Sequence, residues 1–266
     1  MTSTDSTTPV VIITKPADQA EHWLKILSTN GWTVLSVPLL GLEDIPYNAD
    51  QRALWLNLDQ YAGVIMVSPQ AALSCAKALD EYWPQPPAGV HWLCNGAGTA
   101  QTLRAHYPMA DALSLHFPAA GNQAEDVLAL HQMQHVAQQK WLIVAGEGGR
   151  TVMADTLITR GANVTRLEVY RRHSLRLNQA QVQSLSIPDA IIQISSRQAL
   201  ESLTSQAPLV TKQEVKLLVS SSRLAAAAEQ HAWQHIMQAN GASLEATLNA
   251  LKRHANHPVI DRTKSS

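Results

Sequence analysis

The sequence predicts an α/β fold made of two similar halves, each with a parallel sheet covered by helices on both faces. Short apolar runs alternate with segments of helical periodicity along most of the chain. Such alternation, with short turns, is typical of parallel sheets wound on both faces. A repeated order of segments and a length of 266 residues, enough for two medium-sized domains, support the division into halves.

The repeat consists of four pairs of matching segments that occur in the same order along the chain. The pairs are residues 11–34 with 141–164, 63–73 with 190–200, 92–100 with 217–225, and 121–128 with 241–248. A single pair could arise by chance, because an apolar strand followed by a small polar residue is common. Four pairs in one order, with slowly shrinking offsets, indicate two copies of a four-unit module.

In the first half each element follows from a local pattern. Residues 10–13 and 33–37 are short apolar strands, and the helix between them opens at Pro16 and ends at Gly31. Residues 38–46 begin and end with proline, which predicts an extended connector. Three further strands are predicted at residues 64–67, 91–94 and 115–117.

Two helix starts in this half carry capping signals. Ser68 precedes Pro69, an arrangement that caps a helix whose first residue is proline. Gly121-Asn122 is followed by Glu125, which predicts a capping box at the start of another helix.

Residues 141–172 form the stretch around which the chain is organised. An apolar strand at residues 141–145 leads into the glycine-rich turn Gly146-Glu-Gly-Gly-Arg150. An amphipathic helix ending near Gly161 and a strand closing on Tyr170-Arg171-Arg172 follow. The second copy of the remaining three units then continues to about Arg253.

Composition and charge exclude several classes of function. A formal net charge of −1 gives no basic field, so nucleic acid is not an expected partner. No apolar run reaches the roughly 18 residues of a membrane span. Residues 1–9 lack the features of a signal peptide, and residues 1–9 and 254–266 are expected to be disordered tails.

The cysteine and histidine patterns indicate neither disulfides nor a metal site. Cys75 and Cys94 are not arranged as Cys-x-x-Cys, and we expect free thiols in a cytoplasmic protein. The eleven histidines are scattered, without the His-Glu-x-x-His pattern or a close cluster with cysteine.

The candidate ligand-binding residues lie where strands end and helices begin. In parallel sheets ligands gather at the carboxyl ends of the strands. Helix starts carry about half a positive charge, so the small residues and cations found there predict a ligand with many negative groups. The candidates are Thr14, Lys15, Ser68, Gly98, Thr99, Gly148, Gly149, Arg150, Ser195, Ser196, Ser220 and Ser221.

Each signal also has a purely structural interpretation. Gly146–Arg150 departs from both glycine patterns of nucleotide-binding loops, and a plain strand-to-helix turn competes with an anion site. The serines are equally suited to be simple helix caps, and none lies in Gly-x-Ser-x-Gly. Tyr170, at a strand boundary, is either a packing residue or a functional one.

With these residues in view, the chain resembles the uroporphyrinogen-III synthase family over about residues 10–251. The strongest part is Gly146-Glu-Gly-Gly-Arg150, followed by Arg160-Gly161-Ala162 and then Tyr170-Arg171-Arg172. The chain departs from the family pattern at Lys15, where arginine is more usual, and at Asn95, where valine is more usual.

The resemblance implies two flavodoxin-like domains joined by a two-stranded ladder, with the substrate in the cleft between them. By analogy, residues 1–37 and 172–266 form one lobe, and residues 38–171 form the other. The ladder would consist of residues 38–45 and 167–173.

The resemblance also implies a cofactor-independent lyase of haem biosynthesis. Hydroxymethylbilane, a linear tetrapyrrole with carboxylate arms, loses water and closes to uroporphyrinogen III with its last pyrrole ring inverted. Tyr170 matches the family's cleft tyrosine and is the candidate for assisting departure of the hydroxyl group. A monomer that receives its substrate from the preceding pathway enzyme is expected. The alternative is a non-catalytic, two-lobed binder of an anionic small molecule, or a silent relative of the synthase.

Overall fold

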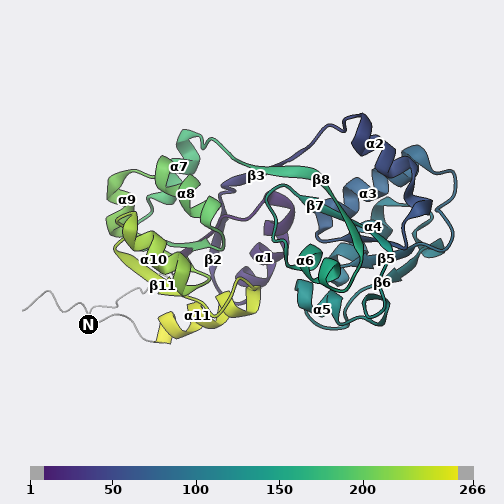
Figure 1. Cartoon of the computed structure of the whole chain (residues 1–266). Coiled ribbons are helices and arrows are strands. Elements are labelled where there is room, and N and C mark those ends of the chain that lie inside the picture. The colour runs from purple at the N-terminus through teal and green to yellow at the C-terminus, as the bar shows by residue number, and fades with distance from the viewer. Residues whose placement is uncertain (1–8, 257–266) are drawn as a thin grey trace, which may run out of the picture. The chain divides into compact units, whose positions relative to one another are not determined.

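The computed structural model describes residues 9–256, which form two units with one sheet each (Figure 1). The discontinuous unit combines the chain up to Gly41 with the chain from His173 onward, and the continuous unit is Leu42–Arg172. The division falls inside β3 (Leu40–Asp44) and β8 (Asn163–Ser174), which are neighbouring strands of one sheet. The paired strands are parallel except at β3, which runs antiparallel to β8: Ile45 N–H donates to the Val169 carbonyl and Leu175 N–H to the Leu39 carbonyl.

The discontinuous unit contains a five-stranded sheet in the order β11-β10-β9-β1-β2. Ile12, Ile192 and Leu217 pack on one face of it with helices α8 and α10. The alternate residues Val11 and Ile191 pack on the other face with α1 and α11, as the two-residue period of strands requires. The elements are β1 (Val10–Ile13), α1 (Ala17–Thr29), β2 (Thr33–Ser36), α7 (Gln179–Leu185), β9 (Ile191–Ile194), α8 (Arg197–Gln206), α9 (Leu209–Glu214), β10 (Lys216–Val219), α10 (Ser222–Gln230), β11 (His235–Gln238) and α11 (Leu244–Asn256).

The continuous unit contains a six-stranded sheet in the order β3-β8-β7-β4-β5-β6. Val64, Trp92 and Val144 pack on the face covered by α3 and α4. Ile65 and Ile143 pack on the opposite face, which α5 and α6 cover (Figure 1). Besides β3 and β8 the elements are α2 (Ala49–Leu56), η1 (Leu58–Gln60), β4 (Gly63–Met66), α3 (Pro69–Tyr82), β5 (His91–Cys94), α4 (Ala97–His106), η2 (Ala110–Ala112), β6 (Ser114–His116), α5 (Ala124–Leu128), η3 (His131–Met133), β7 (Lys140–Gly146) and α6 (Val152–Thr159).

The strand orders agree with the predicted duplication. Read from its other edge, the larger sheet runs β6-β5-β4-β7-β8, which corresponds strand for strand to β11-β10-β9-β1-β2. The first three segment pairs join four of these five strand pairs, and the fourth joins α5 and α11, the helices that follow β6 and β11. Each sheet therefore contains one full set of units, with the opening unit of one sequence copy and the remaining units of the other. β3 is an additional edge strand of the larger sheet.

The helix predicted to start at Gly121-Asn122 with Glu125 begins one residue later. Its N-cap is Gln123, and the carboxylate that reaches back is Asp126, whose Oδ2 accepts from the Gln123 N–H at 2.8 Å. Gly121 has a φ of 84° and turns the chain before the helix, which moves the capping box by one position.

The prediction of a disordered tail from His254 onward is wrong for His254–Asn256, which are helical. Helix α11 continues to Asn256, because Ala250 and Leu251 are buried and hold its last turns against the sheet. The rest of that tail and residues 1–8 lie outside the described residues. Within residues 9–256, no helix has the length and hydrophobicity needed to cross a bilayer.

Candidate functional site

A cavity of about 400 Å³ lies in the continuous unit, where β4, β7 and β8 end or turn. Its position agrees with the rule that ligands bind at the carboxyl ends of parallel strands. The polar side chains that line it are Ser68, Asn95, Arg150, Arg166, Tyr170 and Arg172. Three of these six are arginines, which gives the cavity a cationic wall.

The hydroxyl of Tyr170 is a buried polar group of this cavity. Tyr170 is only 3% exposed, and its hydroxyl lies 3.0 Å from Ser68 Oγ. Arg172 Nη2 donates to the same hydroxyl at 3.5 Å, and the Arg172 guanidinium carbon lies 5.6 Å from the Tyr170 ring centroid. Ser68 also caps α3 by accepting from the Ala71 N–H at 3.2 Å, so the helix start fixes the partner of the tyrosine.

A bulge in β8 and a glycine in β7 set the position of the Tyr170 ring. Ala145 pairs with Glu168 and Gly146 with Tyr170, which leaves Val169 as an extra residue in β8. The Glu147 N–H donates to the Tyr170 carbonyl at 2.8 Å. A Cβ atom on Gly146 would lie 2.5 Å from Tyr170 Cζ, so a larger residue there would displace the ring.

The glycine-rich turn is held by Arg166 and Glu168, two residues of β8 that the sequence analysis missed. Arg166 donates to the carbonyl oxygens of Gly146 at 2.9 Å and Arg150 at 3.3 Å. Glu168 Oε1 accepts from Arg166 Nε and from the Gly148 N–H, both at 3.3 Å. The signal was an oppositely charged pair two residues apart, and therefore on one face of a strand that leads to Tyr170.

The amides of Gly148 and Gly149 donate within the protein. Gly148 donates to Glu168 and Gly149 to the Gly146 carbonyl, the latter at 3.4 Å. The Arg150 side chain is exposed, and its Nη2 donates to Gln123 Oε1 at 2.6 Å. At this turn the arginine side chain, rather than these two amides, therefore has donors available for a ligand.

In the discontinuous unit, Thr14 and Lys15 follow β1 and have different surroundings. Thr14 is 4% exposed, and its hydroxyl donates to the Gln193 carbonyl at 2.6 Å, a structural bond. The Lys15 ammonium lies 4.4 Å from the Trp23 ring centroid, and burial lowers the pKa of Lys15. Among side chains that the structure describes, none forms an ion pair with Lys15.

The four predicted serines of this unit lie at the ends of the neighbouring strands β9 and β10. Ser196 and Ser221 are N-caps, with Oγ accepting from Ala199 N–H at 3.2 Å and Leu224 N–H at 3.3 Å. Ser220 Oγ donates to the Ser195 carbonyl at 3.4 Å. The helix-cap interpretation therefore describes Ser196 and Ser221, and Ser220 ties two strand ends together.

The family model described as uroporphyrinogen-III synthase HemD matches residues 21–249, most of the chain. The chain belongs to the uroporphyrinogen-III synthase family. The synthase of Escherichia coli K12 is 28% identical over 251 residues, which are 91% of this chain and 99% of that protein. The synthase of Proteus mirabilis is 33% identical over 165 residues, which are 61% of this chain and 79% of that one.

A solved structure shows the same fold. The uroporphyrinogen-III synthetase of Helicobacter pylori 26695 superposes with a TM-score of 0.56 at 14% identity, covering 91% of this chain and 97% of that chain. At this identity the likeness concerns the arrangement of elements and not the site residues.

Two further residues that the sequence predicts as ligand-binding, Gly98 and Thr99, do not line the cavity at Tyr170. Both are in the first turn of α4. Thr99 is 5% exposed, and the Gly98 carbonyl accepts from Thr102. Asn95, a departure from the family pattern, lines the cavity instead and donates to the Asn122 carbonyl at 3.3 Å.

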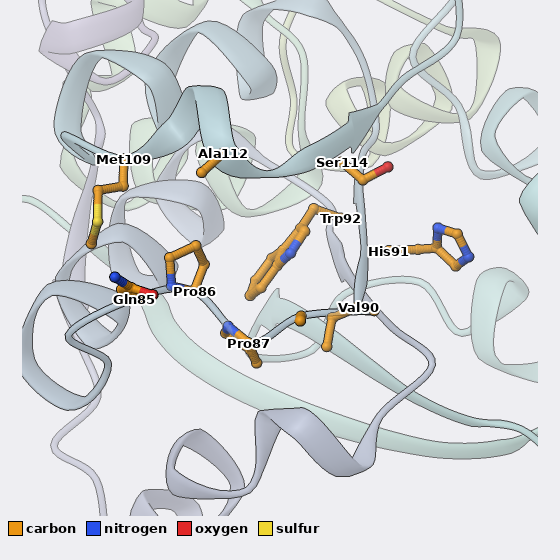
Figure 2. Close-up of a pocket in the computed structure, with 11 residues that line it drawn as sticks. Gln85, Pro86, Pro87, Val90, His91, Trp92, Met109, Ala112 and Ser114 are labelled. Carbon is orange, nitrogen blue, oxygen red and sulfur yellow. The ribbon is translucent and has the colours of Figure 1, made fainter.

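The continuous unit has a second cavity, of about 530 Å³, at the amino ends of β5 and β6 (Figure 2). Its wall includes Pro86, Pro87 and Trp92, and Figure 2 shows His91 directed away from Trp92. Although this cavity is larger, no lysine or arginine is among the residues that line it. A ligand rich in carboxylates is therefore better matched by the cavity at Tyr170.

Proposed function

We propose that the chain is a uroporphyrinogen-III synthase that converts hydroxymethylbilane into uroporphyrinogen III in haem biosynthesis. Family membership supports this function. The observation that carries it is the buried Tyr170 hydroxyl, hydrogen-bonded to Ser68 and Arg172 in a cavity with arginines in its wall. The reaction is a dehydration with ring closure, so it consumes no oxidant or reductant.

Tyr170 assists the first step. The bond between the terminal carbon and its hydroxyl oxygen breaks. An electron pair from the pyrrole ring forms a new double bond to that carbon, and the result is an electrophilic azafulvene. Proton donation from the Tyr170 hydroxyl lets the hydroxyl group leave as water. Arg172 donates to the tyrosine oxygen and stabilises the negative charge that develops on it.

Ring inversion follows from the way the substrate is held. The last pyrrole attacks the azafulvene through its substituted carbon, and the spiro intermediate reopens and closes with that ring inverted. The protein must therefore bend a flexible chain until its two ends meet, which is catalysis by positioning. Cations that bind the acetate and propionate arms do this work.

Arg150 and Lys15 are the cations assigned to substrate carboxylates. Arg150 lines the cavity, and its guanidinium presents a planar fork that matches a carboxylate. Lys15 offers a compact point charge where the family more often has arginine, so it binds a carboxylate with less directional preference. The serines at the ends of β9 and β10 provide hydroxyl groups in the same unit as Lys15.

The assembly and location of the enzyme are part of the proposal. We infer a cytoplasmic monomer that takes its substrate from the enzyme that makes hydroxymethylbilane. Analytical ultracentrifugation of the purified chain measures its mass, and a stable dimer would contradict the monomer.

Product analysis tests the function. Hydroxymethylbilane is generated in situ, the porphyrinogens are oxidised, and the isomers are separated by chromatography. The type III isomer is expected in excess over the protein-free reaction. Only the spontaneous type I isomer would contradict catalysis and favour a non-catalytic binder of anionic molecules.

A further inference from the structure

Two arginines of the glycine-rich turn region have partners of different charge. Arg166 forms an ion pair with Glu168 at 3.3 Å and donates inward to two backbone carbonyls. Arg150 donates to the side-chain oxygen of Gln123, a neutral group, at 2.6 Å. Within residues 9–256 no carboxylate forms an ion pair with Arg150.

The Gln123 side chain is oriented by its neighbours. Its Nε2 donates to Asn122 Oδ1 at 3.3 Å, which directs the oxygen toward Arg150. Its backbone N–H donates to Asp126 Oδ2 at 2.8 Å at the start of α5. Gln123 is 27 positions from Arg150 in sequence, so the contact fixes the turn after β7 relative to the start of α5.

We propose that Gln123 is a positioning residue, which directs the Arg150 guanidinium toward a substrate carboxylate and leaves its positive charge uncompensated. This inference rests on the proposed function. A neutral amide oxygen accepts one N–H of the guanidinium, which has five N–H donors. A carboxylate in the same place would compete with the substrate for the fork.

The choice of partner therefore determines how strongly Arg150 attracts an anion. An arginine paired with glutamate, such as Arg166, already has its counter-charge in the protein. An arginine held by glutamine has its direction fixed and its charge available. Arg166, which donates to the carbonyls of the turn, is thus paired with a glutamate, whereas Arg150, at the end of the turn, is held by a glutamine.

The test is Gln123→Glu, which changes the charge of the acceptor and keeps its size. We expect KM for hydroxymethylbilane to rise about fivefold, the scale of an exposed ion pair, with kcat within about twofold of wild type. Gln123→Leu removes the acceptor without adding charge and should raise KM less than Gln123→Glu. Arg150→Ala should raise KM at least as much as Gln123→Glu.

The decisive comparison uses the double variant. If Gln123 acts through Arg150, adding Gln123→Glu to Arg150→Ala changes KM less than twofold. A residue that only caps α5 would show the same effect with and without Arg150, together with a lower Tm. An unchanged KM in Gln123→Glu, or an undiminished effect in the Arg150→Ala background, would overturn the proposal.

A binding measurement separates this proposal from the proposed function. Uroporphyrin III, a tetrapyrrole with the same acetate and propionate arms, is titrated against wild type and Gln123→Glu, and tryptophan fluorescence reports binding. A Kd about fivefold weaker for Gln123→Glu supports the role of Gln123 even if the wild type yields only the type I isomer. An equal Kd overturns that role, whatever isomer the wild type forms.

Discussion

At the residue scale, the surroundings of Tyr170 differ from those of an ordinary tyrosine at a strand end. The hydroxyl contacts a helix cap, Ser68, and a cation, Arg172, while the ring is packed in the core of the continuous unit. Tyr107, in the same core, is 1% exposed, and its hydroxyl has no partner in the described part of the chain. The two tyrosines therefore form a matched pair for testing what the hydroxyl does.

The first prediction concerns Tyr170→Phe, which removes the proton donor and keeps the ring. We expect kcat to fall about a hundredfold, the low end of general acid catalysis, with a smaller change in KM. Tyr107→Phe is the control and should leave kcat unchanged, because its hydroxyl has no bond to lose. Steady-state kinetics measure both variants, and an unaltered kcat in Tyr170→Phe removes its assigned role.

The second prediction concerns Lys15, whose pKa burial lowers below the usual value of 10.5. The folded protein then binds this proton less tightly than the unfolded chain does. Its stabilising contribution is present above pH 10.5 and is lost as the pH falls through the folded pKa. As the pH is lowered from 10.5 to neutral, the free energy of unfolding of wild type should therefore fall relative to that of Lys15→Met.

Urea unfolding of both proteins at the two pH values measures this difference. Lys15→Met should also raise KM, because it removes a cation assigned to the substrate. A difference in unfolding free energy that does not vary with pH would show that burial has no effect on the lysine. An unchanged KM would remove Lys15 from the binding site.

At the element scale, β8 organises the site of the continuous unit. Arg166 and Glu168 form hydrogen bonds to the glycine-rich turn, and the bulge at Val169 places Tyr170 opposite Gly146. Hydrogen bonds thus link the strand, its bulge and the turn, and helix α6 begins at Val152, after the turn. The shape of this turn depends on side chains of β8 as well as on the turn's own amides.

The third prediction is that Arg166→Met loosens the glycine-rich turn. The variant loses the bonds to two backbone carbonyls and leaves them without their donor, which should cost about 1–3 kcal/mol of stability. KM should rise, because Arg150 is attached to the released end of the turn. Urea unfolding and kinetics measure the two effects.

Arg171→Met is the matched control on the same strand. Arg171 pairs with Glu43 at 2.9 Å, and the two side chains are 47% and 51% exposed. Exposed pairs contribute at most about 1 kcal/mol, so this variant should resemble wild type. Equal losses in Arg166→Met and Arg171→Met would contradict a specific role for Arg166.

At the scale of the whole molecule, the two copies of the module have diverged at the turn after their equivalent strands β7 and β1. One copy has Gly146–Arg150 with a buried tyrosine nearby, and the other has Thr14-Lys15-Pro16. The strand order has been kept in both sheets. The two similar units therefore have different polar groups at equivalent turns.

The fourth prediction is that residues 40–174 fold alone but do not catalyse. The segment contains every strand of the six-stranded sheet, and helices cover both of its faces. Circular dichroism with urea unfolding should show one cooperative transition. Product analysis should yield only the type I isomer, because Lys15 and the strand ends of the other unit are missing. A fragment without a cooperative transition would contradict the independence of its core.

The sequence was a good guide to the elements and their order. Alternating apolar strands and amphipathic helices are local signals, and the repeat showed which strands correspond. Capping was predicted well at Ser68, where the helix begins with proline, but was one residue off at Gln123. There the left-handed Gly121 added a turn that a spacing rule does not contain.

By itself, the sequence determined the α/β class and the family, indicated the duplication, and gave Tyr170 and Arg150 as candidate site residues. Only the tertiary structure showed the bonds that make these residues a site, namely Ser68 with Tyr170 across 102 positions and Gln123 with Arg150 across 27. It also showed that Arg166 donates to the Gly146 carbonyl of the glycine-rich turn. The physical reason is that periodicity is a property of neighbouring residues, whereas a side-chain hydrogen bond depends on how sheet register and bulges bring distant residues together.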